Sequence, residues 1–232
     1  MNSVCLLCKC VVKDNTLFSD LSDEQLGRFK DIIVTHHHKK KDVIFWEGDE
    51  CDGFHVVKSG RVKIIRTSRT GKEQIIKIAQ PGEIIGMEAF YGEKRYANTA
   101  VTMDDCELCL IEKKAFFKIL EEHPAISRKI IIALSKELKT AYDKIGDMGL
   151  KTAKEKMAHL LCTLAKDYGV QQDGKIKLNL NLSRLDIAEL LGITQETSIR
   201  LLKTFKEAGI IDIKRKEIII KSIQMLEAAG ES

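Results

Sequence analysis

The sequence lacks any apolar run approaching the roughly 18 residues that a membrane-spanning helix requires. It also lacks a signal-peptide pattern, because the opening MNSVCLLCKC is only briefly apolar and has no basic residue before its apolar part. We therefore expect a cytoplasmic protein that has no membrane partner.

The residue patterns of common catalytic sites are missing as well. We find no Ser/His/Asp set, no phosphate-binding loop and no HExxH pattern in the 232 residues. An enzyme needs a nucleophile, a general base or an open metal site, so the sequence predicts a protein that is not an enzyme.

Cysteine, in contrast, is present seven times. The cytoplasm keeps thiols reduced, so disulfides are not expected there. The cysteines are then predicted to be metal ligands or buried apolar residues.

Charge is modest overall, with a formal net charge of +4. The segment from Lys151 to Ser232 holds 14 of the Lys and Arg residues against 11 of the Asp and Glu residues, so it carries +3 of that total. The run KRK at 214–216 sharpens this excess. A basic C-terminal part favours a nucleic-acid partner.

Residues 17–31 form an amphipathic pattern that predicts a short helix. Between about residues 41 and 112 the sequence pattern changes to short runs rich in Val and Ile, which are separated by glycines. Closely spaced strands with glycine turns predict an antiparallel β-roll or sandwich. We interpret THHHKKK at 35–41 as a solvated polar run rather than as a metal or haem site.

After Pro124 the apolar spacing becomes helical, and from Leu134 onward it follows a heptad. A helix that packs only on its own domain usually has a broader apolar stripe. The narrow seam predicts pairing with the same helix of a second subunit. Glycines 146 and 149 would weaken or end this helix and form a hinge. The dimerisation residues are Leu134, Leu138, Ala141 and Ile145.

The stretch LSRLDIAELLGITQETSIRLLKTF at 182–205 predicts two short helices joined at a glycine. Ser183 and Thr194 are the expected N-caps, and Gly192 the expected left-handed residue between the helices. Leu185, Ala188 and Leu191 are expected to bury one side of the first helix. Two helices joined in this way predict a helix-turn-helix, and the basic hairpin that follows fits a wing.

The side chains on the outer face of the second helix match the hydrogen-bonding groups of DNA bases. Glu196 and Arg200 are four residues apart and so share one face; a carboxylate accepts from cytosine N4, and a guanidinium donates twice to guanine. Gln195 and Ile199 are candidates for neighbouring bases or a thymine methyl. The remaining DNA-binding candidates are Thr194 as the cap and, for phosphates, Lys203, Lys206, Lys214, Arg215 and Lys216.

Three segments, GDECDGFHVVKSGRVKI, GKEQIIKIAQPGEIIGMEAF and LSRLDIAELLGITQETSIRLLKTFKEAGII, resemble transcription regulators of the Crp/Fnr family. The resemblance covers about residues 17 to 225. It implies an α+β fold with an N-terminal antiparallel β-roll of the cyclic-nucleotide-binding type, a long dimerisation helix and a C-terminal winged helix-turn-helix. It also implies homodimers that bind inverted repeats in double-stranded DNA and recruit or block RNA polymerase.

We accordingly predict four parts of the chain. They are a cysteine-bearing segment at 1–16, a sensor β-roll at 17–123, a dimerisation helix with its hinge at 124–150, and a DNA-binding domain at 151–232.

The effector is less evident. Cyclic-nucleotide readers of the family carry a Gly-Glu and an Arg-Ser pair, whereas this chain has Gly86-Met87 and Arg95-Tyr96 at the matching positions. Glu88 lies one place further on and would point to the other face of a strand. A cyclic nucleotide or another small molecule is therefore kept only as an alternative.

The cysteines give the preferred interpretation of the effector. The oxygen-sensing FNR branch of the family holds a 4Fe-4S cluster on three N-terminal cysteines and one near the end of the roll. The resemblance places Cys5, Cys8, Cys10 and Cys109 in these roles, although Cys10 follows Cys8 more closely than the branch expects. An intact cluster would favour the paired helices and set two recognition helices about 34 Å apart, and oxygen or nitric oxide would reverse this.

Two other metal sites compete with the cluster. Two C-x-x-C pairs, one of them Cys106 to Cys109, match the spacing of a zinc site. His55 alternates with apolar neighbours and is a candidate haem ligand, but a hydrogen-bonded strand histidine is the simpler interpretation. Cys51 and Cys162 are interpreted as structural.

Overall fold

The structure is a computed structural model that describes residues 32–91, 94–214 and 217–230. Its contacts divide the chain into two compact units, Met1–Leu138 and Lys139–Ser232, and each is described by itself. The division falls inside helix α4 (Pro124–Leu150), so the predicted boundaries at 123/124 and 150/151 stay predictions. The predicted helix at 17–31 lies outside the described residues.

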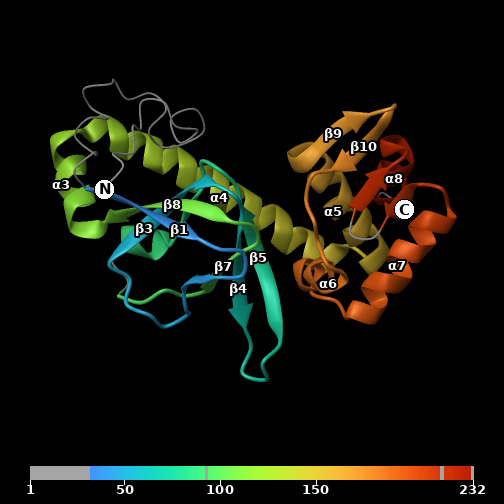
Figure 1. Cartoon of the computed structure of the whole chain (residues 1–232), viewed down its shortest axis with the longest axis horizontal. Helices are drawn as coiled ribbons and strands as arrows, with labels where there is room; N and C mark the ends of the chain where they lie inside the picture. Colours follow the sequence, from blue (N-terminus) through green and yellow to red (C-terminus); the bar gives the residue numbers. More distant parts are fainter. Residues whose placement is uncertain (1–31, 92–93, 215–216, 231–232) are drawn as a thin grey trace. The chain divides into compact units, whose positions relative to one another are not determined.

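The first unit is built on two antiparallel four-stranded sheets (Figure 1). One has the order β1 (Ile33–His38), β8 (Cys106–Glu112), β3 (Gly53–Ser59) and β6 (Ile84–Ile85). The other has the order β2 (Val43–Phe45), β7 (Thr99–Thr102), β4 (Val62–Thr67) and β5 (Glu73–Ala79). The predicted antiparallel β-roll is confirmed.

Strand β3 of the first sheet is buried from Gly53 to Val57. Phe54 on β3 meets Phe116 of α3 (Lys113–Glu122), with ring centroids 4.7 Å apart, and Phe90 of the short helix η2 (Met87–Tyr91). Phe54 and Phe116 are fully buried, and burial of each such side chain is worth about 1.5–3 kcal/mol. The aromatic contacts therefore fix α3 on the sheet.

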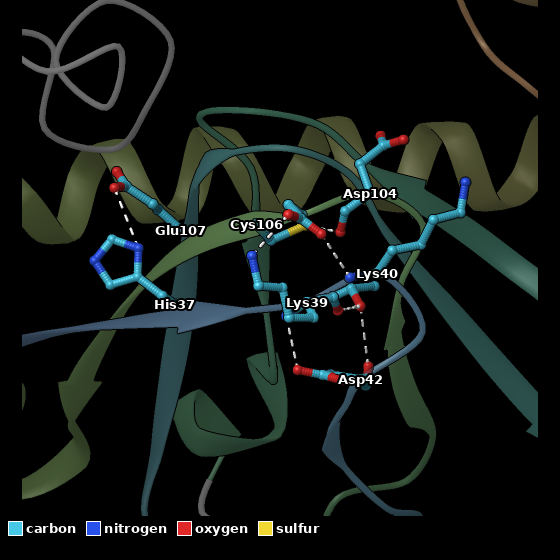
Figure 2. A network of polar contacts seen from close by, with 9 residues as sticks. His37, Lys39, Lys40, Asp42, Asp104, Cys106 and Glu107 are labelled. Atoms are coloured by element: carbon cyan, nitrogen blue, oxygen red, sulfur yellow. Dashed lines mark hydrogen bonds and ion pairs between the residues drawn. The ribbon is translucent and has the colours of Figure 1, made fainter.

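Strand β1 was not predicted, since THHHKKK looks too polar for a strand. Its six residues pair with β8 from Ile33↔Ile111 to His38↔Cys106. A polar group of this stretch has a partner on the neighbouring strand β8 (Figure 2). The Nδ1 atom of His37 lies 3.3 Å from the Glu107 carboxylate. Long-range pairing thus overrides the local sequence pattern.

The turn after β1 is tied down in the same way. Lys39 donates its backbone N–H to Asp42 at 2.7 Å and its ammonium to Asp105 at 3.0 Å, and the Lys40 N–H also bonds Asp105 (Figure 2). Lys41 adopts a left-handed φ of 74°. The carboxylates of Asp42 and Asp105 thus hold the turn in which Lys41 has a backbone conformation that a lysine rarely adopts.

A glycine is required where β3 turns into β4. Gly60 has a φ of 79°, and a Cβ there would lie 2.5 Å from the Cys106 sulfur and from the Asp105 carbonyl oxygen. Any side chain would clash with the start of β8, so this close approach selects glycine.

Helix α4 runs for 27 residues through Gly146 and ends at Leu150. Gly146 thus does not end the helix, which stops one residue after Gly149, and the predicted weakening and hinge stay predictions. Isolated glycines cost a helix only about 1 kcal/mol each, which the neighbouring helix formers offset.

The second unit begins with α5 (Ala153–Tyr168), which Thr152 caps through a capping box with Glu155. Next come strands β9 (Gly169–Gln172) and β10 (Lys175–Leu178), helices α6 (Arg184–Leu191) and α7 (Gln195–Glu207), strands β11 (Ile211–Lys214) and β12 (Glu217–Ile220), and α8 (Ile223–Gly230). The strands form one sheet in the order β11-β12-β10-β9. No helix among the described residues is long and apolar enough to span a membrane.

Candidate DNA-binding surface and sensor sites

Helix α6 begins as the sequence predicts. The Ser183 hydroxyl accepts the Asp186 N–H at 3.0 Å, and the Asp186 carboxylate accepts the Ser183 N–H at 2.9 Å, which completes a capping box. Its buried residues are Ile187, Ala188 and Glu189. The prediction that Leu185 is buried is wrong, because its side chain is 49% exposed.

The turn between the helices is also as predicted. Gly192 has a left-handed φ of 66°, and its N–H donates to the Ala188 carbonyl. Thr194 then caps α7, and its hydroxyl accepts the Thr197 N–H at 3.2 Å. Two helices with a left-handed residue between them form a helix-turn-helix.

Helix α7 has one buried and one open side. Leu202 and Phe205 are each 1% exposed, and Leu201 is half-buried. All the residues predicted to face outward are exposed: Gln195, Glu196, Ile199, Arg200 and Lys203. The buried side therefore anchors the helix and leaves five contiguous polar and apolar groups on the surface.

Ion pairing on α7 is selective. Lys203 pairs with Glu207 at 3.7 Å, four residues on, and Lys206 pairs with Asp212 at 3.6 Å. Glu196 and Arg200 have the same four-residue spacing, yet no ion pair joins them within the described chain. Glu196 and Arg200 therefore do not form an ordinary surface ion pair.

Strands β11 and β12 form the predicted hairpin, with the register Lys214↔Glu217 at its end. Lys177 of β10 pairs with Glu217 at 2.8 Å. Lys214 is exposed, whereas Arg215 and Lys216 lie outside the described residues. The hairpin follows α7 directly and has the position of a wing.

Helix α4 exposes an apolar seam. Of the predicted dimerisation residues, Leu134 is 39%, Leu138 53% and Ile145 65% exposed, and Ala141 is exposed as well. Sequence reasoning missed two further apolar members, Ile131 and Tyr142, which are also exposed. Their spacing of three and four residues from Leu134 and Leu138 is the signal that identifies them.

The two cysteines of β8 cannot share a metal ion. Cys109 is paired in register with Thr35 and Val56, and its sulfur lies 3.8 Å from the Thr35 hydroxyl. Cys106 lies three residues away, hence on the opposite face, where its thiol donates to the Arg61 and Asp104 carbonyl oxygens. This geometry argues against the zinc site with paired C-x-x-C motifs.

The described residues contain no group of three or more His, Cys, Asp or Glu residues arranged to hold a metal. Three of the four predicted cluster ligands, Cys5, Cys8 and Cys10, lie outside the described residues, and only Cys109 is placed. Cys51 is buried and donates to the Gly53 carbonyl at 3.7 Å, while Cys162 is half-buried.

Packed side chains occupy the positions that match the cyclic-nucleotide motif. Tyr96 is buried, stacks on Phe45 with centroids 3.8 Å apart, and donates its hydroxyl to the Gly53 carbonyl at 2.9 Å. Glu88 is buried and accepts the Ala97 N–H at 3.1 Å. It lies on η2, so its prediction as a strand residue is wrong.

Arg95 is exposed and donates to the Gly48 carbonyl oxygen. Its guanidinium is thus engaged with the backbone of a neighbouring turn. Together with Tyr96, which fills the space beside Gly86, this arrangement disfavours a cyclic phosphate at these positions.

His55 was predicted to be a hydrogen-bonded strand histidine. It is only 8% exposed and lies 5.8 Å from the Phe45 ring, but its Nδ1 has no hydrogen-bond partner within the described chain. Burial, followed by the neighbouring His36 and His38, lowers the pKa of His55 to about 4.

A β-roll joined through a long helix to a winged helix-turn-helix defines a DNA-binding transcription regulator, not an enzyme. Comparison with known families is consistent with this. Residues 35–123 match a cyclic nucleotide-binding domain and residues 155–229 match a Crp-like helix-turn-helix domain. The chain belongs to the Crp/Fnr family.

Two relatives show how far the similarity extends. The regulatory protein HlyX of Actinobacillus pleuropneumoniae is 28% identical over 94% of this chain and 90% of that protein. An anaerobic regulatory protein of Haemophilus influenzae is 26% identical over 95% of this chain and 86% of that protein. Among solved structures, FixK2 from Bradyrhizobium japonicum aligns with a TM-score of 0.76 at 24% identity, over 87% of this chain and 98% of that one, which supports the fold.

We predict that His55 makes the sensor unit sensitive to acid. The folded histidine stays neutral down to about pH 4, whereas the unfolded one takes up a proton near the ordinary histidine pKa of 6.5. The unfolded chain therefore binds more protons between these values, so stability is full above pH 6.5 and falls as the pH drops toward 4, by about 3 kcal/mol at most. Urea unfolding at pH 5 and pH 7.5, followed by fluorescence of the single tryptophan, Trp46, measures this.

A His55→Gln variant should lose most of the difference between the two pH values. His37→Gln, at an exposed position of β1, serves as the matched control and should retain it. Equal pH dependence in the wild type and in His55→Gln would contradict the assignment.

Proposed function

We propose that this regulator acts as a homodimer on an inverted repeat and reads bases through Glu196 and Arg200. The observation that carries the proposal is that both groups are exposed and not paired with each other, while Lys203 and Glu207, at the same spacing on the same helix, do pair. Two unpaired opposite charges on one helix face suit the donor and acceptor pattern of a G·C base pair.

Other residues of the surface take complementary roles. Gln195 and Ile199 flank this pair, and Ile199 offers an apolar contact for a thymine methyl. Thr194, Lys203, Lys206, Lys214, Arg215 and Lys216 are assigned to the DNA backbone. The carboxylate partners of Lys203 and Lys206 lie on the surface, where ion pairs contribute only about 0–1 kcal/mol, so phosphates can replace them.

The apolar seam of α4 supplies the dimer. Leu134, Leu138, Ala141 and Ile145, together with Ile131 and Tyr142, are exposed in the single chain. Such a contiguous apolar stripe costs free energy in water and is covered when an identical helix packs on it. A two-fold axis along this seam gives two recognition helices, which suits an inverted repeat. RNA polymerase is the proposed further partner, and the cytoplasm the proposed location.

For the effector, we infer a 4Fe-4S cluster held by Cys5, Cys8, Cys10 and Cys109. Two observations support it. Over most of its length the chain is similar to a protein named as an anaerobic regulator, and the thiol of Cys109 is buried on β8. When bound, the cluster supplies sensitivity to oxygen or nitric oxide. Packing around Tyr96 favours this over a cyclic nucleotide, and the opposite faces of Cys106 and Cys109 favour it over zinc.

Base reading predicts a specific signature in DNA binding. Arg200→Ala should weaken operator binding about tenfold or more and relax the preference for guanine at one position of each half-site, because a bidentate contact is worth about 1–3 kcal/mol. Fluorescence anisotropy with a set of single-base operator variants at fixed salt measures both effects.

Lys214→Gln is the matched comparison. It should weaken all sequences alike and lower the slope of log affinity against log salt by about 1, since it removes a phosphate contact. If Arg200→Ala keeps the base preference of the wild type, the role of Arg200 is wrong.

Disruption of the seam should separate the subunits. Leu138→Glu places a charge in the proposed interface at a position that is exposed in the single chain, so folding should survive while the dimer dissociates. We expect sedimentation velocity to give a monomer and operator affinity to fall at least tenfold. Lys136→Glu, on the opposite side of α4, should remain dimeric. A Leu138→Glu dimer with wild-type affinity would exclude this seam.

The cluster makes a third prediction. Protein purified without oxygen should contain about four iron and four sulfide ions per chain, and Cys109→Ser should lose most of them. Cys106→Ser is the matched control and should keep the cluster, because its sulfur lies on the other face of β8. Analysis of iron and sulfide, with zinc measured in parallel, distinguishes the cluster from a zinc site. Iron-free wild-type protein, or a full cluster in Cys109→Ser, argues against the proposal.

A further inference from the structure

A cleft of about 580 Å³ opens on the sensor unit, and none of the residues assigned above to DNA, the dimer or the cluster is among those that line it. Three segments line it: the loop between β2 and β3, the residue Lys94 before β7, and one side of α3. Its lining residues are Glu50, Cys51, Asp52, Lys94, Lys113, Lys114, Phe117, Lys118 and Glu121. Segments far apart in the sequence thus converge on one concave site.

Four of the residues that line this cleft are lysines. Lys94, Lys114 and Lys118 are exposed, and none of them forms an ion pair with a carboxylate anywhere in the part of the chain that the structure describes. Glu50, Asp52 and Glu121 line the same cleft, yet none of them forms an ion pair with these three lysines. Lys94, Lys114 and Lys118 therefore remain available for an anion that enters from solvent.

The start of α3 increases the positive potential. Its first turn holds Lys113 and Lys114 and no acidic residue, and the N-cap Glu112 makes no side-chain capping bond. Cations at this end of a helix oppose the macrodipole, whereas an anion is stabilised there by about 0.3–1 kcal/mol. The sequence thus departs from the usual helix start at the same place where the lysines gather.

The remaining lining is apolar or neutral. Phe117 is half-buried and presents part of its ring to the cleft. Cys51 is 3% exposed, and burial raises the pKa of its thiol, so this group adds no negative charge to the cleft. A ligand with a small apolar body would find a contact surface beside the charged rim.

We propose that this cleft binds a small phosphate monoester, whose phosphate is held by Lys94, Lys114 and Lys118 and whose organic group lies on Phe117. Ammonium groups bind phosphate as point charges, and several of them acting together compensate for its double negative charge. The site belongs to the sensor unit and uses none of the residues proposed to read DNA, so it stands independently of the proposed function.

Isothermal titration of the full chain with phenyl phosphate tests the site. We expect saturable binding to the wild type, and weaker binding of inorganic phosphate, which lacks the ring that contacts Phe117. The double variant Lys114→Gln/Lys118→Gln should bind phenyl phosphate at least tenfold more weakly. Both lysines are exposed, so folding should be preserved, and circular dichroism checks this.

Two controls separate the cleft from general electrostatics. Arg69→Gln/Lys72→Gln removes the same charge from the exposed end of the β4–β5 hairpin and should bind phenyl phosphate like the wild type. Arg200→Ala should do so too, which excludes the DNA-binding face as the site measured. DNA affinity of the Lys114→Gln/Lys118→Gln variant without ligand should be unchanged, so the two proposals fail separately.

Three results would overturn the proposal. They are the absence of saturable phenyl phosphate binding by the wild type, equal weakening in the cleft and hairpin double variants, and wild-type affinity in Lys114→Gln/Lys118→Gln.

Discussion

The burial of one side of α7 is the constraint on which the DNA-binding surface depends. Leu202 and Phe205 are almost completely removed from water, and Gly192 and Thr194 set where the helix begins. Each buried side chain contributes about 1.5–3 kcal/mol, far more than any surface ion pair on the same helix. The exposed side chains are thus held by a rigid helix rather than by a flexible loop, and this is what a base-reading surface needs.

In the sensor unit, the pairing of strand β8 decides where the chemically important side chains lie. Strand β8 is paired on both sides, with β1 and with β3, and its register decides which face each cysteine occupies. The register separates Cys106 from Cys109, although the two are close in sequence. It also sets His55 beside Phe45 on β2, and burial there lowers its pKa. One pairing pattern therefore determines the chemical environment of three titratable groups.

Local signals in the sequence were sufficient wherever the physical cause is local. The capping residues Ser183 and Thr194, the left-handed Gly192 and the alternating apolar runs of the roll all appear as predicted, because each depends on neighbours within a few residues. The prediction failed for β1, where hydrogen bonds to a strand some seventy residues away outweigh a polar sequence. It failed for Leu185 as well, because the packing of α6 on its neighbours, not helical periodicity alone, selects the buried side.

The sequence by itself determined the class of fold, the helix-turn-helix with its outward-facing Glu196 and Arg200, and the family, since these follow from periodicity, capping and short motifs. Only the tertiary structure decided that these two charges remain unpaired, that Tyr96 fills the space beside Gly86, and that lysines from separate segments meet in one cleft. The physical reason is that pairing, packing and convergence depend on distances between residues far apart in the chain, and no local pattern encodes such distances.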